Sequence, residues 1–171
     1  MEQVILVDEF DNVVGAMDKL EAHHKGVLHR AFSIMIFNSK GELLQQKRST
    51  HKYHSGGLWT NSCCSHPKPN ESTAEAASTR LKYEMGIDLQ PDFVYKFLYK
   101  SQLDNNLIEH EMDHVFTGVF NGMPVINMDE VEDWKFVGIE DLRADIERHP
   151  QKYTVWFRLI MNHPHLKQII A

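Results

Sequence analysis

The apolar run over residues 32–37, FSIMIF, is the feature that most constrains the fold of this chain. Its nearly continuous hydrophobic residues predict a strand that is buried on both faces, because a half-exposed strand would alternate apolar and polar positions. Residues 38–41, NSKG, predict a turn into a second apolar segment at 42–45. The two segments therefore form a hairpin at the centre of a sheet, with other elements packed against both of its faces.

Further strands and helices are predicted on both sides of this hairpin. Residues 4–7 and 13–14 flank a turn and indicate an N-terminal hairpin within about the first 22 residues. A helix is expected to begin at Ser72, which forms a capping box with Glu75, and to end at Gly86. The remaining predicted elements are strands at 58–64, 93–99, 109–120 and 134–139, and helical segments from 140 onward that Pro150 and Pro164 interrupt.

Length and composition fit one domain over residues 1–171. The chain has 171 residues and 42% hydrophobic content, which is enough for a substantial core but short for two domains. A net charge of −6 gives no support to a broad nucleic-acid surface. The sequence has no apolar run of about 18 residues and no basic flank at its start. We therefore expect a cytoplasmic protein with no nucleic-acid or membrane partner.

Both cysteines of the chain occur side by side in the stretch TNSCCSHP, residues 60–67. Adjacent cysteines cannot link distant parts of a fold, so both are predicted to be free thiols. Because alternate side chains on a strand share a face, the side chains of Cys64 and His66 are expected to lie on the same face of the sheet and to line one cavity. An inert, buried cysteine is the alternative interpretation of this stretch.

Glu109 and Glu111 are also two residues apart on a predicted strand. Their carboxylates are expected on one face, about 7 Å apart at the backbone. A solvated edge strand would explain them, but the apolar segment that follows at 115–120 favours a strand that carries both acids into the core. A buried pair of like charges requires a cation.

Eleven histidines are available to complete such a site. His23, His29 and His66 lie where predicted strands begin or end, and with two carboxylates they suit a divalent transition metal such as zinc or manganese. His24 is undecided because it adjoins His23. The other seven are interpreted as surface or packing residues: His51, His54, His110, His114, His149, His163 and His165.

The capped helix carries Arg80 and Glu84 on one face, four residues apart. A surface ion pair is the simplest interpretation, but residues 65–87 also partly match the Nudix box, Gly-x5-Glu-x7-Arg-Glu-U-x-Glu-Glu-x-Gly-U, in which U is aliphatic. The residues that match are Glu71, Leu81, Glu84, Gly86 and Ile87, whereas Ser65, Thr79, Arg80 and Tyr83 replace consensus residues. Arg80 and Tyr83 stand where the consensus has glutamates. Loss of these two acids predicts a chain that keeps the Nudix fold and binds a metal diphosphate without hydrolysing it.

Together, the motifs resemble those of the type I isopentenyl diphosphate isomerases. The matching stretches are LHRAFSIMIFN, GGLWTNSCCSHP, NESTAEAASTRLKYEMGI, IEHE and MDEVEDWKF, in this order over roughly residues 20–160. The resemblance implies an α/β (α+β) fold with a Nudix-like mixed sheet flanked by helices. It also implies the reversible 1,3-allylic isomerisation of isopentenyl diphosphate to dimethylallyl diphosphate in isoprenoid biosynthesis.

The resemblance implies a role for each residue that matches a motif. The implied catalytic residues are Cys64, Glu111, Tyr99 and Trp156, whereas Cys63 falls on a variable position. The implied ligands of a tightly bound Mn²⁺ or Zn²⁺ are His23, His29, His66, Glu109 and Glu111, with His24 as the alternative to His23. The implied substrate site has Glu84 holding Mg²⁺ against the diphosphate, with cationic contacts from Arg48, Lys52 and Arg80 and Ser65 as a further binding residue.

Two other functions remain open from the sequence. A Nudix hydrolase that cleaves a diphosphate is supported by Glu71 and Glu84 but lacks the other acids of the box. A non-catalytic metal-binding module would have the metal site without turnover. The expected partner is the small-molecule diphosphate, and the expected state is a monomer or weak dimer.

Overall fold

The chain folds around β3 (His29–Phe37), which is the strand predicted from the apolar run. The structure, a computed structural model, describes residues 2–170; Met1 and Ala171, the two ends of the predicted domain, lie outside the described residues. Along its whole length β3 pairs in parallel with β8 (Ile108–Val119). On its other side it pairs antiparallel with β6 (Cys63–Ser65). The sheet is therefore mixed, as predicted.

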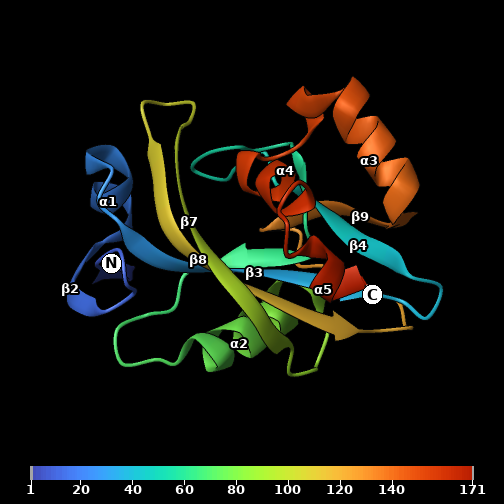
Figure 1. The fold of residues 1–171 in the computed structure, drawn as a ribbon, viewed down its shortest axis with the longest axis horizontal. Helices are drawn as coiled ribbons and strands as arrows, with labels where there is room; N and C mark the ends of the chain where they lie inside the picture. Colours follow the sequence, from blue (N-terminus) through green and yellow to red (C-terminus); the bar gives the residue numbers. More distant parts are fainter. Residues whose placement is uncertain (1, 171) are drawn as a thin grey trace.

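The remaining strands extend the sheet from this central pair. β7 lies antiparallel to β8, and the two long strands cross the molecule together (Figure 1). The other strand bounds are β1 (Gln3–Val7), β2 (Val13–Asp18), β4 (Glu42–Arg48), β5 (Trp59–Thr60), β7 (Asp92–Gln102) and β9 (Val131–Gly138). The predicted N-terminal hairpin is confirmed as β1 and β2, and the predicted central hairpin as β3 and β4.

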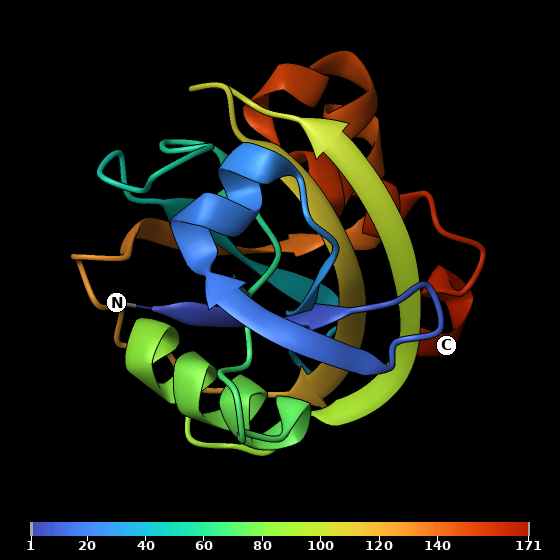
Figure 2. The same cartoon turned by 90° about the vertical axis from the view of Figure 1, so that its left-hand side faces the viewer.

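Helices cover both faces of β3, which explains why its apolar residues do not alternate with polar ones. Ile34 and Ile36 pack in a cluster with Leu81 of α2 (Thr73–Met85), whereas Met35 packs in a different cluster with Phe157. Phe157 belongs to α4, and the elements of that second face are α3 (Ile139–Arg148), a short 3₁₀ turn η1 (Pro150–Lys152), α4 (Val155–Met161) and α5 (Leu166–Ile170). Figures 1 and 2 show α2 on one side of the sheet and α3 to α5 on the other.

The caps of α2 are as predicted. The Ser72 side chain accepts a hydrogen bond from the backbone N–H of Glu75, and the Glu75 side chain accepts one from the backbone of Ser72. Gly86 ends the helix in a left-handed conformation with φ of +66°. Glycine adopts this conformation without a steric penalty, so Gly86 correctly predicted where the helix ends.

Two elements differ from the prediction. The expected strand at 58–64 is divided into β5 and β6, because Asn61 and Ser62 bend the chain; the Asn61 Nδ2 donates to the carbonyl of Ile34, and the Ser62 Oγ donates to that of Leu44. The helix α1 (Lys19–Lys25) was not predicted, although its caps, Asp18 and Gly26, follow ordinary rules. Within residues 2–170 no helix is long and apolar enough to span a membrane.

Candidate functional site

A cavity opens at the end of the sheet where the parallel strands β3 and β8 begin. It encloses about 440 Å³ of space, part of which is open to solvent. The predicted site residues that line it are Arg48, Lys52, Cys64, Ser65, His66, Arg80, Glu109, Glu111 and Trp156. The other four contact this lining: Tyr99 bonds Glu111, His29 lies against Glu111, His23 lies against Glu109, and Glu84 bonds Arg80. The structure thus brings all the predicted site residues together.

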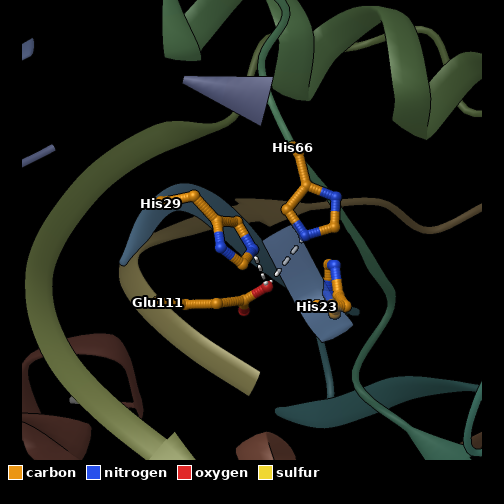
Figure 3. A group of neighbouring side chains, drawn as sticks. All are labelled: His23, His29, His66 and Glu111. Carbon is orange, nitrogen blue, oxygen red and sulfur yellow. Dashed lines mark hydrogen bonds and ion pairs between the residues drawn. The ribbon is translucent and has the colours of Figure 1, made fainter. Parts of the chain in front are cut away.

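Three histidines and Glu111 form a compact group at one end of this cavity. Their donor atoms all lie within 4.8 Å of one another. His29 Nε2 is 3.1 Å and His66 Nε2 is 2.8 Å from the same carboxylate oxygen of Glu111, with His23 beside them (Figure 3). The group combines residues from α1, the start of β3, the residue that follows β6, and β8, so it exists only in the folded chain.

The hydrogen bonds behind these rings fix their tautomers. The Nδ1 of His23 lies 2.7 Å from the carbonyl oxygen of Lys19, and the Nδ1 of His29 lies 2.9 Å from that of Val27. A carbonyl only accepts, so Nδ1 carries the proton in both rings and Nε2 offers a lone pair to the cavity, which is the arrangement of metal-binding histidines. Lone pairs and carboxylate oxygens that converge in this way require a cation, so the residues present fit a divalent metal.

His23, and not His24, belongs to this group. His23 is fully buried and His24 is exposed, although the two are neighbours on α1. The Nε2 of His23 is 3.7 Å from Oε2 of Glu109. Both predicted carboxylates are buried and face the cavity, so the strand that carries them is not a solvated edge.

His54, interpreted from the sequence as a surface or packing residue, is buried at the cavity. Its side chain is only 2% exposed and its Nε2 lies 2.9 Å from Oε1 of Glu109. His23, His54 and Glu109 form a second group whose donor atoms lie within 4.8 Å of one another, close enough to hold a metal ion. No pattern in the sequence identified His54 as a residue of the site.

Cys64 lines the same cavity as His66 and Trp156. Burial raises the pKa of its thiol to about 12, although the nearby Arg48 guanidinium opposes the rise. Arg48 Nη1 is 3.7 Å from the Cys64 sulfur and its guanidinium carbon lies 5.1 Å from the centre of the Trp156 ring. The sulfur therefore carries a proton at neutral pH, and the π face beside it already accommodates a cation.

Glu111 has the opposite protonation state. Burial favours its neutral form, but positive charge at the His29 and His66 rings, from a proton on Nε2 or from a bound cation, holds the pKa of its carboxyl well below the usual range. The Tyr99 hydroxyl donates a bond of 2.7 Å to its other oxygen, and burial raises the pKa of that hydroxyl well above its usual range. One cavity thus presents a protonated thiol and an ionised carboxylate.

The opposite end of the cavity is a network of paired charges. Arg80 Nε donates to Oε2 of Glu84 at 2.6 Å, and Gln46 donates to Oε1 of Glu84 at 3.0 Å. Arg80 also contacts Glu130 at 3.1 Å, and Lys52 forms a close ion pair with Glu130. Glu130 was not predicted as a site residue, although it lies in the stretch MDEVEDWKF.

Comparison with known proteins agrees with this site. The Nudix domain family model matches residues 27–157. A protein named isopentenyl-diphosphate Delta-isomerase 2 from Photorhabdus laumondii is 53% identical over 161 residues, which are 94% of this chain and 91% of the relative. Its namesake from Aromatoleum aromaticum is 51% identical over 155 residues, 91% of this chain and 82% of the relative. The chain belongs to the isopentenyl-diphosphate Delta-isomerase family.

Solved structures extend the fold of this isomerase family to more distant Nudix proteins. The protein DR0079 from Deinococcus radiodurans superposes with a TM-score of 0.70 at 20% identity, over 86% of this chain and 90% of that protein. A MutT protein from Methanosarcina mazei gives 0.68 at 19% identity, over 82% of this chain and 94% of that protein. At such identities the likeness concerns the fold alone.

Two further residues of this isomerase-family chain support the site from behind. Asn61 accepts a hydrogen bond from the Trp156 indole at 3.2 Å, and its amide donates to the Cys63 carbonyl at 2.8 Å. Asn61 therefore links β6, which carries both cysteines, to Trp156 through hydrogen bonds. Asp113 continues the alternation of Glu109 and Glu111 along β8 and accepts a hydrogen bond from the Ser33 hydroxyl at 2.8 Å, and burial raises the pKa of its carboxyl well above the usual range. That alternation was the available signal for Asp113.

Proposed function

We propose that this protein catalyses the reversible isomerisation of isopentenyl diphosphate to dimethylallyl diphosphate in isoprenoid biosynthesis. In this reaction a proton is added at one carbon and another is removed two carbons away. The observation that carries the proposal is the presence of the Cys64 thiol and the Glu111 carboxylate in one buried cavity beside Trp156. The relatives that span nearly the whole chain bear the name of this activity.

The reaction requires an acid, a base, a stabiliser of positive charge and exclusion of water. Protonation of an unactivated alkene produces a tertiary carbocation, which bulk water would capture. Cys64 and Glu111 exchange the proton with the substrate, one giving and the other accepting, with the roles reversed in the reverse direction. Trp156 is 3% exposed and offers its π face to the cation, a contact worth about 2 kcal/mol when desolvated.

Tyr99 and the histidine group set the orientation of Glu111. The Tyr99 hydroxyl holds one oxygen of this carboxylate, and His29 and His66 face the other. We assign His23, His29, His66, Glu109 and Glu111 as the ligands of one tightly bound Mn²⁺ or Zn²⁺. When bound, this ion supplies fixed positive charge that tunes the acidity of Glu111.

The paired charges at the other end hold the diphosphate. We assign Glu84 as the residue that keeps Mg²⁺ against the substrate, and Arg48, Lys52, Arg80 and Ser65 as its diphosphate contacts. Arg80 and Lys52 now satisfy Glu84 and Glu130. When the diphosphate binds with Mg²⁺, Arg80 and Lys52 can pair with the phosphates while the carboxylates pair with Mg²⁺. No buried charge is then left without a partner. This explains how an acidic chain binds an anion.

The alternative hydrolase is disfavoured by the position of Glu71. Its carboxylate accepts a hydrogen bond of 3.0 Å from the backbone N–H of Lys68, which stabilises the loop before α2. It does not line the cavity that contains Cys64 and Glu111. Glu71 lines a neighbouring pocket with Ser65 and Arg80, whereas Glu84 bonds Arg80 directly.

The two adjacent cysteines provide the test of this function. Cys64→Ala is expected to lower turnover of isopentenyl diphosphate by about 10²-fold to 10⁴-fold, the range of a lost acid or base. Cys63→Ala is the matched control and keeps most of the activity, because Cys63 packs in the core on the α2 side. Equal losses in the two variants, with both folded by circular dichroism, would contradict the assignment.

A further inference from the structure

The loop between β4 and β5 is built to bury one polar ring, that of His54. Arg48 Nη2 donates to the carbonyl oxygen of His54 at 3.1 Å. Ser55 adopts a left-handed conformation with φ of +53°, which is strained for a residue with a side chain. A Cβ at Gly56 would lie 2.9 Å from the Thr50 carbonyl oxygen, so only glycine fits there. Strain of this kind persists when the surrounding structure requires it, and it marks functional loops.

The buried ring ends in an atom without a hydrogen-bond partner. His54 Nε2 is one of the unsatisfied buried atoms of the described residues, and Oε2 of Glu109 is another. Both belong to the group in which the donor atoms of His23, His54 and Glu109 lie within 4.8 Å of one another. Unpaired buried polar atoms are costly, so two that converge on one place indicate a ligand between them.

The distances in this group are those of atoms that share one ion. Two donors bound to one ion at about 2.1 Å lie about 3 Å apart when they are adjacent. His54 Nε2 lies 2.9 Å from Oε1 of Glu109. His23 belongs both to this group and to the group of His29, His66 and Glu111, and because its Nδ1 faces the Lys19 carbonyl, Nε2 is the atom that both groups share. Since one imidazole nitrogen binds a single ion, the two groups describe one centre.

We propose that His54 is a fourth imidazole ligand of this metal centre; the inference rests on the metal assigned under the proposed function. The His54 Nδ1 lies 3.0 Å from the Ser55 hydroxyl, which can accept its proton and leave Nε2 with a lone pair. The Lys19 and Val27 carbonyls do the same for His23 and His29. Two carboxylates and four neutral imidazoles balance the charge of a divalent ion.

The test counts the imidazole nitrogens bound to one ion. The full-length protein, with ¹⁵N-labelled histidine, is loaded with one equivalent of ¹¹³Cd²⁺, and one-bond ¹¹³Cd–¹⁵N couplings are recorded. Four coupled nitrogens are expected, falling to three in His54→Gln and staying at four in His51→Gln, the matched control from an exposed position of the same loop. Chelator competition should show a Cd²⁺ affinity at least about tenfold weaker for His54→Gln.

Three coupled nitrogens in the unsubstituted protein, with His54 uncoupled, would overturn this inference, leave the proposed function intact, and make His54 a residue that positions Glu109. Absence of every coupling would overturn the assigned metal centre itself. A gain-of-signal variant covers failure of His54→Gln to fold: His54→Cys should add a cadmium–thiolate absorption band in the ultraviolet that His51→Cys does not. No added band in folded His54→Cys would count against the proposal.

Discussion

The two ends of the cavity both bury carboxylates, but they compensate the negative charge differently. At the histidine end, lone pairs and carboxylate oxygens converge, and buried atoms of Glu109 and His54 have no hydrogen-bond partner. At the Glu84 end, each carboxylate already has a cationic partner, Arg80 or Lys52. Hydrogen-bond acceptors are concentrated at the histidine end, whereas cationic donors and carboxylate acceptors are paired at the Glu84 end.

This difference indicates two modes of ion use. Convergent acceptors are stable only with a cation among them, so the histidine end is built for an ion that stays with the folded protein. A self-compensated network needs no ion at rest, so the Glu84 end is built for one that arrives and leaves with the substrate. The predictions below separate these two modes.

The largest expected effect comes from removing one carboxylate at each end. Glu111→Gln is expected to lower turnover by about 10²-fold to 10⁴-fold and also the metal content of the purified protein, because the proposed function assigns Glu111 as both proton carrier and metal ligand. Glu84→Gln is expected to lower turnover while the tightly bound metal remains. Metal analysis of both purified variants measures the contrast; loss of the tight ion from Glu84→Gln would remove the distinction between the ends.

Chelation should destabilise the protein through the histidine end alone. At about 1,000 times its dissociation constant, a bound ion stabilises the folded state by about 4 kcal/mol, which corresponds to roughly 8–16 °C in melting temperature for a chain of this size. Differential scanning fluorimetry after removal of the tight metal should show such a decrease. Omission of Mg²⁺ without substrate should leave the melting curve unchanged, and a decrease of similar size would contradict the account.

The last prediction concerns the reactivity of Cys64 and involves no effect on stability or metal content. Its folded pKa of about 12 keeps the proton on sulfur, so the thiolate fraction and the alkylation rate should rise about tenfold per pH unit from pH 8 to 11. In the Cys63→Ala protein, where Cys64 is the remaining cysteine, iodoacetamide labelling read by mass spectrometry follows this rate. A plateau near pH 9, as for an ordinary thiol, would contradict a buried, protonated Cys64.

Local rules predicted much of the fold. The capping box at Ser72, the glycine stop at Gly86 and the apolar run of β3 each act over a few residues, so the sequence alone revealed them. The division of the strand at 58–64 was missed because it depends on bonds from Asn61 and Ser62 to β3 and β4. Those partners lie 18 to 27 residues away in the chain.

The site residues that lie within recognisable sequence motifs were predictable. Cys64, His66, Glu109 and Glu111 were found because alternation on a strand fixes a shared face, and the family resemblance supplied the distant members. His54 and Glu130 were missed because a loop and a surface-like acid acquire their surroundings only when β4, β8 and α2 come together. No periodicity within the sequence encodes those contacts.

One measurement tests the central claim most directly. The purified protein is mixed with Mg²⁺ and isopentenyl diphosphate in D₂O, and proton and phosphorus NMR spectra are followed over time. The account predicts dimethylallyl diphosphate that carries deuterium on carbon, with the diphosphate intact. Release of phosphate, or an unchanged substrate when zinc or manganese is also supplied, would contradict it.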